Sequence, residues 1–189
     1  MSDGFDEVYV DTRCQLRGVA ESLIAGPQYR ASGTIRLAVR PNGFAGVSFP
    51  LAVHGTELVW PDGGAPLAGP VDPLPTDAFL RLDTAAADWI HRSHYAGGHA
   101  IKKVLPEAHP VLGPEHFDVA AAEDEVNYGV SAGDDYHPTP YAYVAPWTAR
   151  IGPFWNAPFG AVYPLDPAHD VDALALDIAD FFQRGRKEL

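Results

Sequence analysis

Cysteine is almost missing from this chain, which has only Cys14 among its 189 residues. One thiol cannot form an intramolecular disulfide, and it excludes metal sites built from several cysteines. Cys14 lies within a helical pattern and has no basic cluster beside it, so we expect a buried structural thiol rather than a reactive one. The lack of disulfides is typical of a protein in a reducing compartment.

Long apolar runs are missing too, and the first residues do not have the pattern expected of a secretory leader. No run of about 18 apolar residues occurs, so we expect no membrane-spanning segment. The sequence starts MSDGFDEVYVD, which is acidic and lacks the positive charge and apolar run of a signal peptide. These absences predict a cytoplasmic protein.

Positive charge is scarce, with 13 basic residues against 25 acidic ones and a formal net charge of −12. A surface of that sign repels phosphate backbones and anionic lipid headgroups. The one basic run is Arg184, Arg186 and Lys187, and interaction with a helix dipole accounts for it. We therefore expect neither nucleic acid nor a membrane as a partner.

Several common catalytic and nucleotide-binding motifs are absent as well. The sequence contains no GxGxxG, GxxxxGK[ST], HExxH or CxxC segment and no EF-hand loop. We therefore expect no cofactor, and whether the protein is an enzyme stays open.

Apolar periodicity predicts three helices. The first runs from Asp11 to about Ala25, where Gly26-Pro27 is expected to stop it. The second runs from Thr84 to about Lys103, and Gly97-Gly98 is expected to interrupt it. The third follows Asp170, whose side chain suits an N-cap, and carries a continuous apolar stripe.

Alternating apolar residues predict two antiparallel meanders. Tight turns are expected at Pro41-Asn42-Gly43 and at Glu123-Asp124-Glu125, and residues 61–78 are expected to form a loop. The predicted strands are 34–39, 44–49, 51–54 and 56–60 in the first meander, and 117–121, 126–130, 141–145 and 161–163 in the second. This order favours a single α+β domain over residues 1–189, with antiparallel sheet built from two meanders and three helices packed against it.

Polar residues within the second meander are candidates for a site. His116 and Asp118 are two residues apart, so in a strand they share a face, and the carboxylate would orient the imidazole as a general base. A structural pair that anchors the strand end is the alternative. Asn127 lies near Gly129, and is either a buried amide where another group approaches the backbone or a solvent-facing side chain beside a bulge.

The segment 145–160, called the aromatic loop below, is rich in proline and aromatic residues. It carries Trp147, Phe154, Trp155 and Phe159. Four large rings cannot all be exposed in a soluble monomer. They plug the core, line a pocket or form a subunit contact.

His91 and His94 are one helical turn apart, a spacing that suits metal ligands with Asp88 or Glu107 as a further ligand. Surface histidines are the alternative. Because Gly97-Gly98 spoils the register toward His99, we predict no metal site.

Several segments are distinctive when taken as a set: HFD, NYG, a Gly-Asp turn, PYAYVAPW and WNAPFG, with GPQYRASGTIRLAV and PNGF near the start. The set resembles a bacterial family, most common in high-GC genomes, whose members have unknown function. The resemblance covers most of the chain outside residues 61–108. It supports the architecture and implies no activity and no site.

The most direct functional prediction is a pocket for a small polar molecule, between the second meander and the aromatic loop. An uncharged or cationic ligand suits the acidic surface. The predicted catalytic residues are His116 and Asp118, and the predicted ligand-binding residues are Asn127, Tyr128, Trp147 and Trp155. The alternative is a non-catalytic homo-oligomeric scaffold that uses the aromatic loop as its self-contact surface.

We expect the net charge to prevent nucleic-acid binding. A gel-shift assay at low salt, where electrostatic binding is strongest, should show no complex with DNA or RNA up to about 100 µM protein, the weak end of non-specific affinity. A complex that dissolves as salt is added would contradict this expectation.

Overall fold

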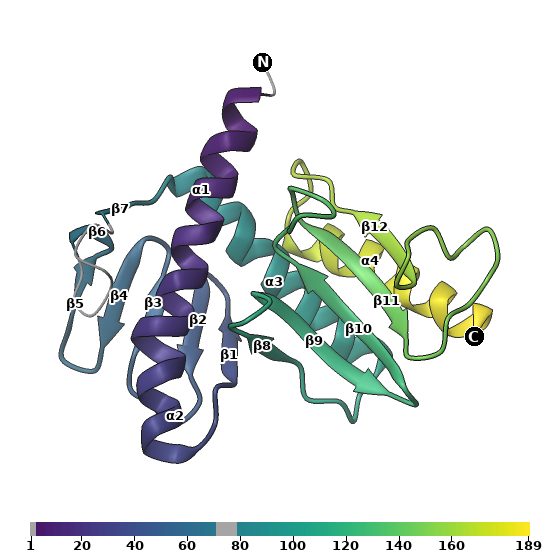
Figure 1. The fold of residues 1–189 in the computed structure, drawn as a ribbon, viewed down its shortest axis with the longest axis horizontal. Helices are drawn as coiled ribbons and strands as arrows, with labels where there is room; N and C mark the ends of the chain where they lie inside the picture. The colour runs from purple at the N-terminus through teal and green to yellow at the C-terminus, as the bar shows by residue number, and fades with distance from the viewer. Residues whose placement is uncertain (1–2, 71–78) are drawn as a thin grey trace. The chain divides into compact units, whose positions relative to one another are not determined.

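The computed structural model describes residues 3–70 and 79–189. Its helices and antiparallel strands confirm the predicted α+β class (Figure 1). Within the described ranges, none of the helices is long and apolar enough to cross a membrane.

Two compact units make up the described chain. The first comprises the residues up to His91 together with Leu112–Phe117, and the second comprises Arg92–Val111 and Asp118–Leu189.

The first unit contains the first meander. Its strands follow the order β8-β1-β2-β3-β4-β5, with every neighbour antiparallel. They are β1 (Leu37–Arg40), β2 (Gly43–Gly46), β3 (Ala52–His54), β4 (Glu57–Trp60), β5 (Gly63–Pro66) and β8 (Val111–Gly113). The predicted meander is therefore confirmed, with shorter strands and a turn at Pro41-Asn42.

The prediction of a loop over residues 61–78 is wrong in its described part. Strand β5 pairs with β4, and β6 (Ala68–Pro70) pairs with β7 (Phe79–Arg81). Strand β5 is exposed along its length and has no alternating pattern, so backbone pairing alone defines it. Residues 71–78 lie outside the described part.

The first helix is longer than predicted. It continues through three segments, α1 (Asp3–Val19), the π-helical η1 (Ala20–Ala25) and α2 (Gly26–Ser32). Pro27 was expected to stop the helix, because its ring collides with the carbonyl four residues earlier. The Gly26 N–H instead bonds to the Glu21 carbonyl, five residues back, and this wider π turn makes room for Pro27 in the first turn of α2.

The expectation that Cys14 is buried is wrong, because its side chain is exposed. The buried positions of α1 are Tyr9, Thr12, Leu16 and Val19. Cys14 lies two residues from both Thr12 and Leu16, which puts it on the opposite side of the helix.

The second unit contains the second meander, in the order β12-β11-β10-β9. Its strands are β9 (Asp118–Glu123), β10 (Val126–Ser131), β11 (Tyr141–Pro146) and β12 (Ala161–Pro164). The predicted turn is confirmed, with Asp124 and Glu125 as its two residues in the left-handed region. Helix α4 (Val171–Glu188) and the part of α3 (Thr84–Val104) that belongs to this unit lie on one side of the sheet (Figure 1).

Helix α3 is continuous, so the expected interruption at Gly97-Gly98 is wrong. A Cβ atom on Gly97 would lie 2.6 Å from Val130 Cγ2 and 2.9 Å from Val119 Cγ1. The glycine therefore brings α3 closer to β9 and β10 than any other residue would allow, and this packing outweighs its poor helix propensity.

Helix α4 confirms the prediction for the C-terminal region. Asp170 caps it, its Oδ1 accepting a hydrogen bond from the Ala173 N–H at 2.9 Å. The apolar stripe is buried at Leu174, Ile178 and Phe182.

His91 is a buried residue of the first unit rather than a surface one, and His94 is buried too. The ring of His91 bonds through Nε2 to the Gly55 carbonyl at 2.9 Å. A carbonyl only accepts, so Nε2 carries the proton and Nδ1 keeps a lone pair. Nδ1 is buried and has no hydrogen-bond partner within the described residues.

Burial lowers the pKa of His91, although the Gly55 bond and the charge of Asp88 partly oppose it. Below about pH 6.5 the unfolded chain therefore binds a proton that the folded chain does not. We predict that acidification lowers the free energy of unfolding, by up to about 1.4 kcal/mol per pH unit from this residue.

Denaturant unfolding between pH 7.5 and pH 5 measures this effect. His91→Gln keeps a donor for Gly55 and removes the titration, so its stability should fall less with acid than that of the native chain. His109→Gln removes an exposed histidine and serves as the control. Equal acid sensitivity in the native chain and in both variants would contradict the prediction.

Candidate functional site on the open face of the second unit

The sheet of the second unit has one face packed against helices and one face that no helix of this unit covers, within its described residues. Antiparallel partners point to the same face. Ser131 pairs with Asp118 on one side and with Tyr141 on the other, and Gly129 pairs with Tyr143. These residues therefore share one face, called the open face below.

The central contact of the open face joins β11 to β9. The hydroxyl of Tyr143 donates a hydrogen bond to Asp118 Oδ2. To reach it the phenol ring crosses β10 over Gly129, where a Cβ atom would lie 2.5 Å from the ring Cζ and the hydroxyl oxygen. Only glycine at 129 allows this contact.

A second phenol–carboxylate pair lies on the adjacent turn. Tyr141 donates its hydroxyl proton to Asp134 Oδ2 at 2.6 Å. Asp134 Oδ1 accepts from the backbone N–H groups of Tyr136 and His137, at 2.8 and 3.1 Å. The turn therefore holds the carboxylate in place beside the ring of Tyr141, whose centroid is 6.3 Å from that of Tyr143.

Both phenols are fixed as proton donors. Burial raises the pKa of Tyr143 well above its usual value, and the charge and hydrogen bond of Asp118 raise it further. The pKa of Tyr141 is raised mainly by burial and then by Asp134. Around neutral pH neither phenol can act as a base, so the carboxylates are the acceptors of this face.

Three predicted site residues lie on the open face: Asp118, Asn127 and Trp147. Asn127 is half-buried between Ala122 and Ala145 on the flanking strands. The Trp147 indole N–H donates to Asn127 Oδ1 at 3.4 Å, and its side chain is 67% exposed. Strand parity from the turn at Asp124 thus places Asn127 on the same face as Asp118.

The other three predicted site residues lie elsewhere. Tyr128 points to the helical side, where it is buried against Phe182 at a ring distance of 5.6 Å. Trp155 contacts Phe154, which packs on Phe181 of α4. His116 is exposed in the turn before β9, so the expectation that it shares a strand face with Asp118 is wrong.

The reason lies at Phe117. Its φ of 51° is in the left-handed region, so the alternation that defines a strand begins only after it, at Asp118. The Phe117 ring packs edge-on against Phe44, with 5.7 Å between the ring centroids, and this contact offsets the cost of the left-handed conformation.

Four residues of the open face and its adjacent turn were not among the predicted site residues: Ser131, Asp134, Tyr141 and Tyr143. A signal for two of them was present, since Tyr-x-Tyr in a predicted strand puts both rings on one face. Asp134 had no such signal, because its position depends on the turn's own hydrogen bonds.

No group of three or more histidine, cysteine, aspartate or glutamate side chains that could hold a metal ion occurs among the described residues. No family model, no curated protein and no solved structure matches the chain. What the open face can bind is therefore inferred from its geometry alone.

We predict that Gly129→Ala destabilises the protein through Tyr143. The added methyl group would displace the phenol ring, at a cost of about 1–3 kcal/mol for overpacking. In a Tyr143→Ala background the same change should cost far less, because the ring is gone. Denaturant unfolding of the four proteins in this cycle gives the coupling, and a coupling near zero would contradict the contact.

Proposed function

We propose that the second unit binds a small polar molecule on its open face, and that the preferred ligand carries a positive charge, as an amine or guanidine does. The Tyr143–Asp118 hydrogen bond across Gly129 carries this proposal. It keeps a phenol and a carboxylate together on a face that the unit's helices leave uncovered.

Charge and ring chemistry support a cationic ligand. Asp118 and Asp134 bring two carboxylates to the neighbouring phenols of Tyr143 and Tyr141. A carboxylate accepts about four hydrogen bonds, and the exposed Asp134 accepts three within the described residues, so a ligand N–H can add one more there. The face of the exposed Trp147 ring can attract a cation, by about 0.5–2 kcal/mol.

Further along the face, Asn127 provides polar recognition. Its neighbours Ala122 and Ala145 are small, so little side-chain volume projects from the sheet between Tyr143 and Trp147. The exposed Trp147 ring borders this strip of small side chains. An aliphatic chain can lie there while its charged end meets the carboxylates.

The geometry supports binding more directly than catalysis. The predicted general base His116 lies in an exposed turn, and no hydrogen bond to its ring occurs within the described residues. The phenols hold their protons. A catalytic role for His116 with Asp118 stays a prediction.

An interaction protein is the second candidate, and one observation favours it. The aromatic loop exposes Trp147 by 67% and Ile151 completely. Apolar side chains held in water at a loop suit contact with another macromolecule.

A matched series of four-carbon molecules tests the first proposal. NMR titration should show saturable shifts of the Gly129 and Tyr143 amides with 1,4-diaminobutane, weaker ones with 1,4-butanediol and none with succinate. Asp118→Asn should weaken diamine binding about tenfold, a loss of roughly 1.4 kcal/mol. Asp62→Asn, on an exposed residue of the first unit, is the matched control.

Equal shifts with the diamine and succinate would show that charge does not select the ligand. Shifts confined to residues outside the open face would place the site elsewhere.

A further inference from the structure

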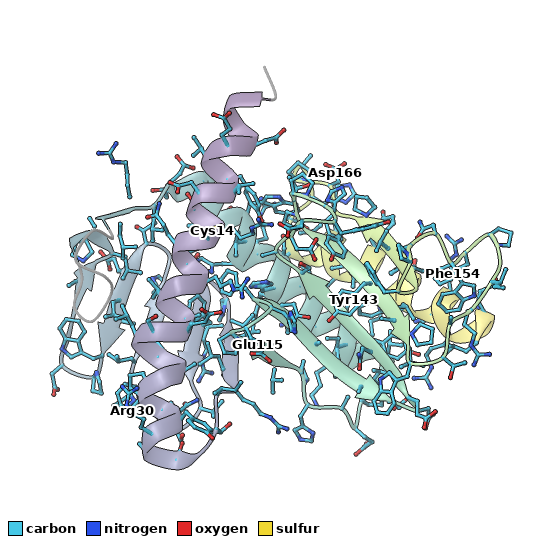
Figure 2. All side chains as sticks on the ribbon, in the orientation of Figure 1. Cys14, Arg30, Glu115, Tyr143, Phe154 and Asp166 are labelled. Carbon is cyan, nitrogen blue, oxygen red and sulfur yellow. The ribbon has the colours of Figure 1, made fainter. Side chains whose placement is uncertain are left out.

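The aromatic loop presents an exposed apolar surface that is held in place. Phe154 packs on Phe181 of α4 at 5.4 Å and on Trp155 at 5.0 Å. At the start of the loop, the backbone N–H of Trp147 donates a hydrogen bond to the Glu125 carbonyl at 2.9 Å. Figure 2 shows Phe154 beside the C-terminal part of α4. A fixed loop loses little entropy when a partner binds.

Basic residues lie on the same two segments as this apolar surface, the aromatic loop and the end of α4. The Arg184 guanidinium lies 5.7 Å from the Phe154 ring centroid, and Arg150 and Lys187 are exposed nearby in the sequence of the loop and the helix. We call the whole set the aromatic-basic surface: Trp147, Arg150, Ile151, Phe154, Arg184 and Lys187.

These cations are available to a partner. Arg186 on the same turn of α4 is engaged by Glu123. Across residues 3–70 and 79–189, by contrast, Arg150, Arg184 and Lys187 take part in no ion pair. Within the described residues these three cations stay unpaired although the chain has 25 acidic and only 13 basic residues.

This charge argues against a two-fold contact between copies. In such a contact the same patch meets itself, so Arg150 and Arg184 would face like charges. The net charge of the whole chain, −12, argues against an anionic membrane, because the acidic remainder of the surface would be repelled by it.

We infer that the aromatic-basic surface docks an acidic segment of another protein. Carboxylates of the segment pair with Arg150 and Arg184, whose guanidinium groups suit bidentate contacts. An aliphatic or aromatic side chain of the segment covers Trp147 and Ile151. This site differs from the proposed ligand site in charge and in its residues, apart from Trp147 at the border of both.

A short fluorescein-labelled peptide that alternates acidic residues with leucine and phenylalanine is the probe. Fluorescence anisotropy should rise saturably with protein, and the affinity should fall as salt is added. Ile151→Asp and Arg150→Glu should each weaken binding by about tenfold or more. Both residues are exposed, so circular dichroism should show an unchanged fold.

Matched controls separate the surface from general effects. Val47→Asp places the same charge on an exposed apolar residue of the first unit, and Arg30→Glu reverses an exposed cation there; neither should change the affinity. A peptide with serine in place of leucine and phenylalanine should bind at least about tenfold more weakly. Binding of 1,4-diaminobutane should be the same in Ile151→Asp as in the native chain, so each proposal can fail without the other.

Four results would overturn the inference. They are no saturable binding of the apolar acidic peptide, equal binding of the serine peptide, self-association in sedimentation velocity that Ile151→Asp abolishes, and co-sedimentation with phosphatidylserine vesicles that the same variant abolishes. The third would assign the surface to a second copy, and the fourth to a membrane.

Discussion

The hydrogen bond from Tyr143 to Asp118 is the contact on which the open face depends. It joins β9 and β11, the two strands that flank β10, and it requires that nothing larger than a hydrogen atom stand at Gly129. Covering this face with a helix would bury a carboxylate, which costs several kcal/mol unless a cation pairs with it. The hydrogen bond that links β9 and β11 therefore also keeps this face polar.

Strand β10 shows how one short segment serves both faces. Tyr128 packs against Phe182 of α4, and Val130 fills the space that Gly97 leaves in α3. Between them Gly129 points the other way and lies beneath the Tyr143 ring. Three consecutive residues thus fix two helices on one side and the site on the other. A slip of one residue in register would exchange the two sets, so the packing of the core also sets the geometry of the site.

The sequence predicted those features that depend on residues close together in the chain. The Asp170 cap, the turn at Asp124 and the two meanders follow from capping, turn and alternation signals, and the structure contains all of them. The errors arise where a distant or unusual contact overrides the local signal. A π turn lets a helix pass Pro27, and a left-handed Phe117 delays the strand so that His116 falls outside it. Asp118 and Asn127 share a face because strand parity is a local property, whereas the crossing of a ring over Gly129 is not.

Trp147 connects the two proposed surfaces of the second unit. Its indole N–H bonds to Asn127 on the open face, while its exposed ring belongs to the aromatic-basic surface. A cation on the open face that draws the Asn127 carbonyl to itself competes with the indole for that oxygen. The Trp147 ring then loses one of the contacts that orient it toward a docked segment. Linkage is reciprocal, so a docked segment that holds the Trp147 ring in place would lower the affinity of the open face for its ligand by the same factor. The 3.4 Å length of this bond marks it as weak, so the coupling between the two surfaces would be small and negative in cooperativity.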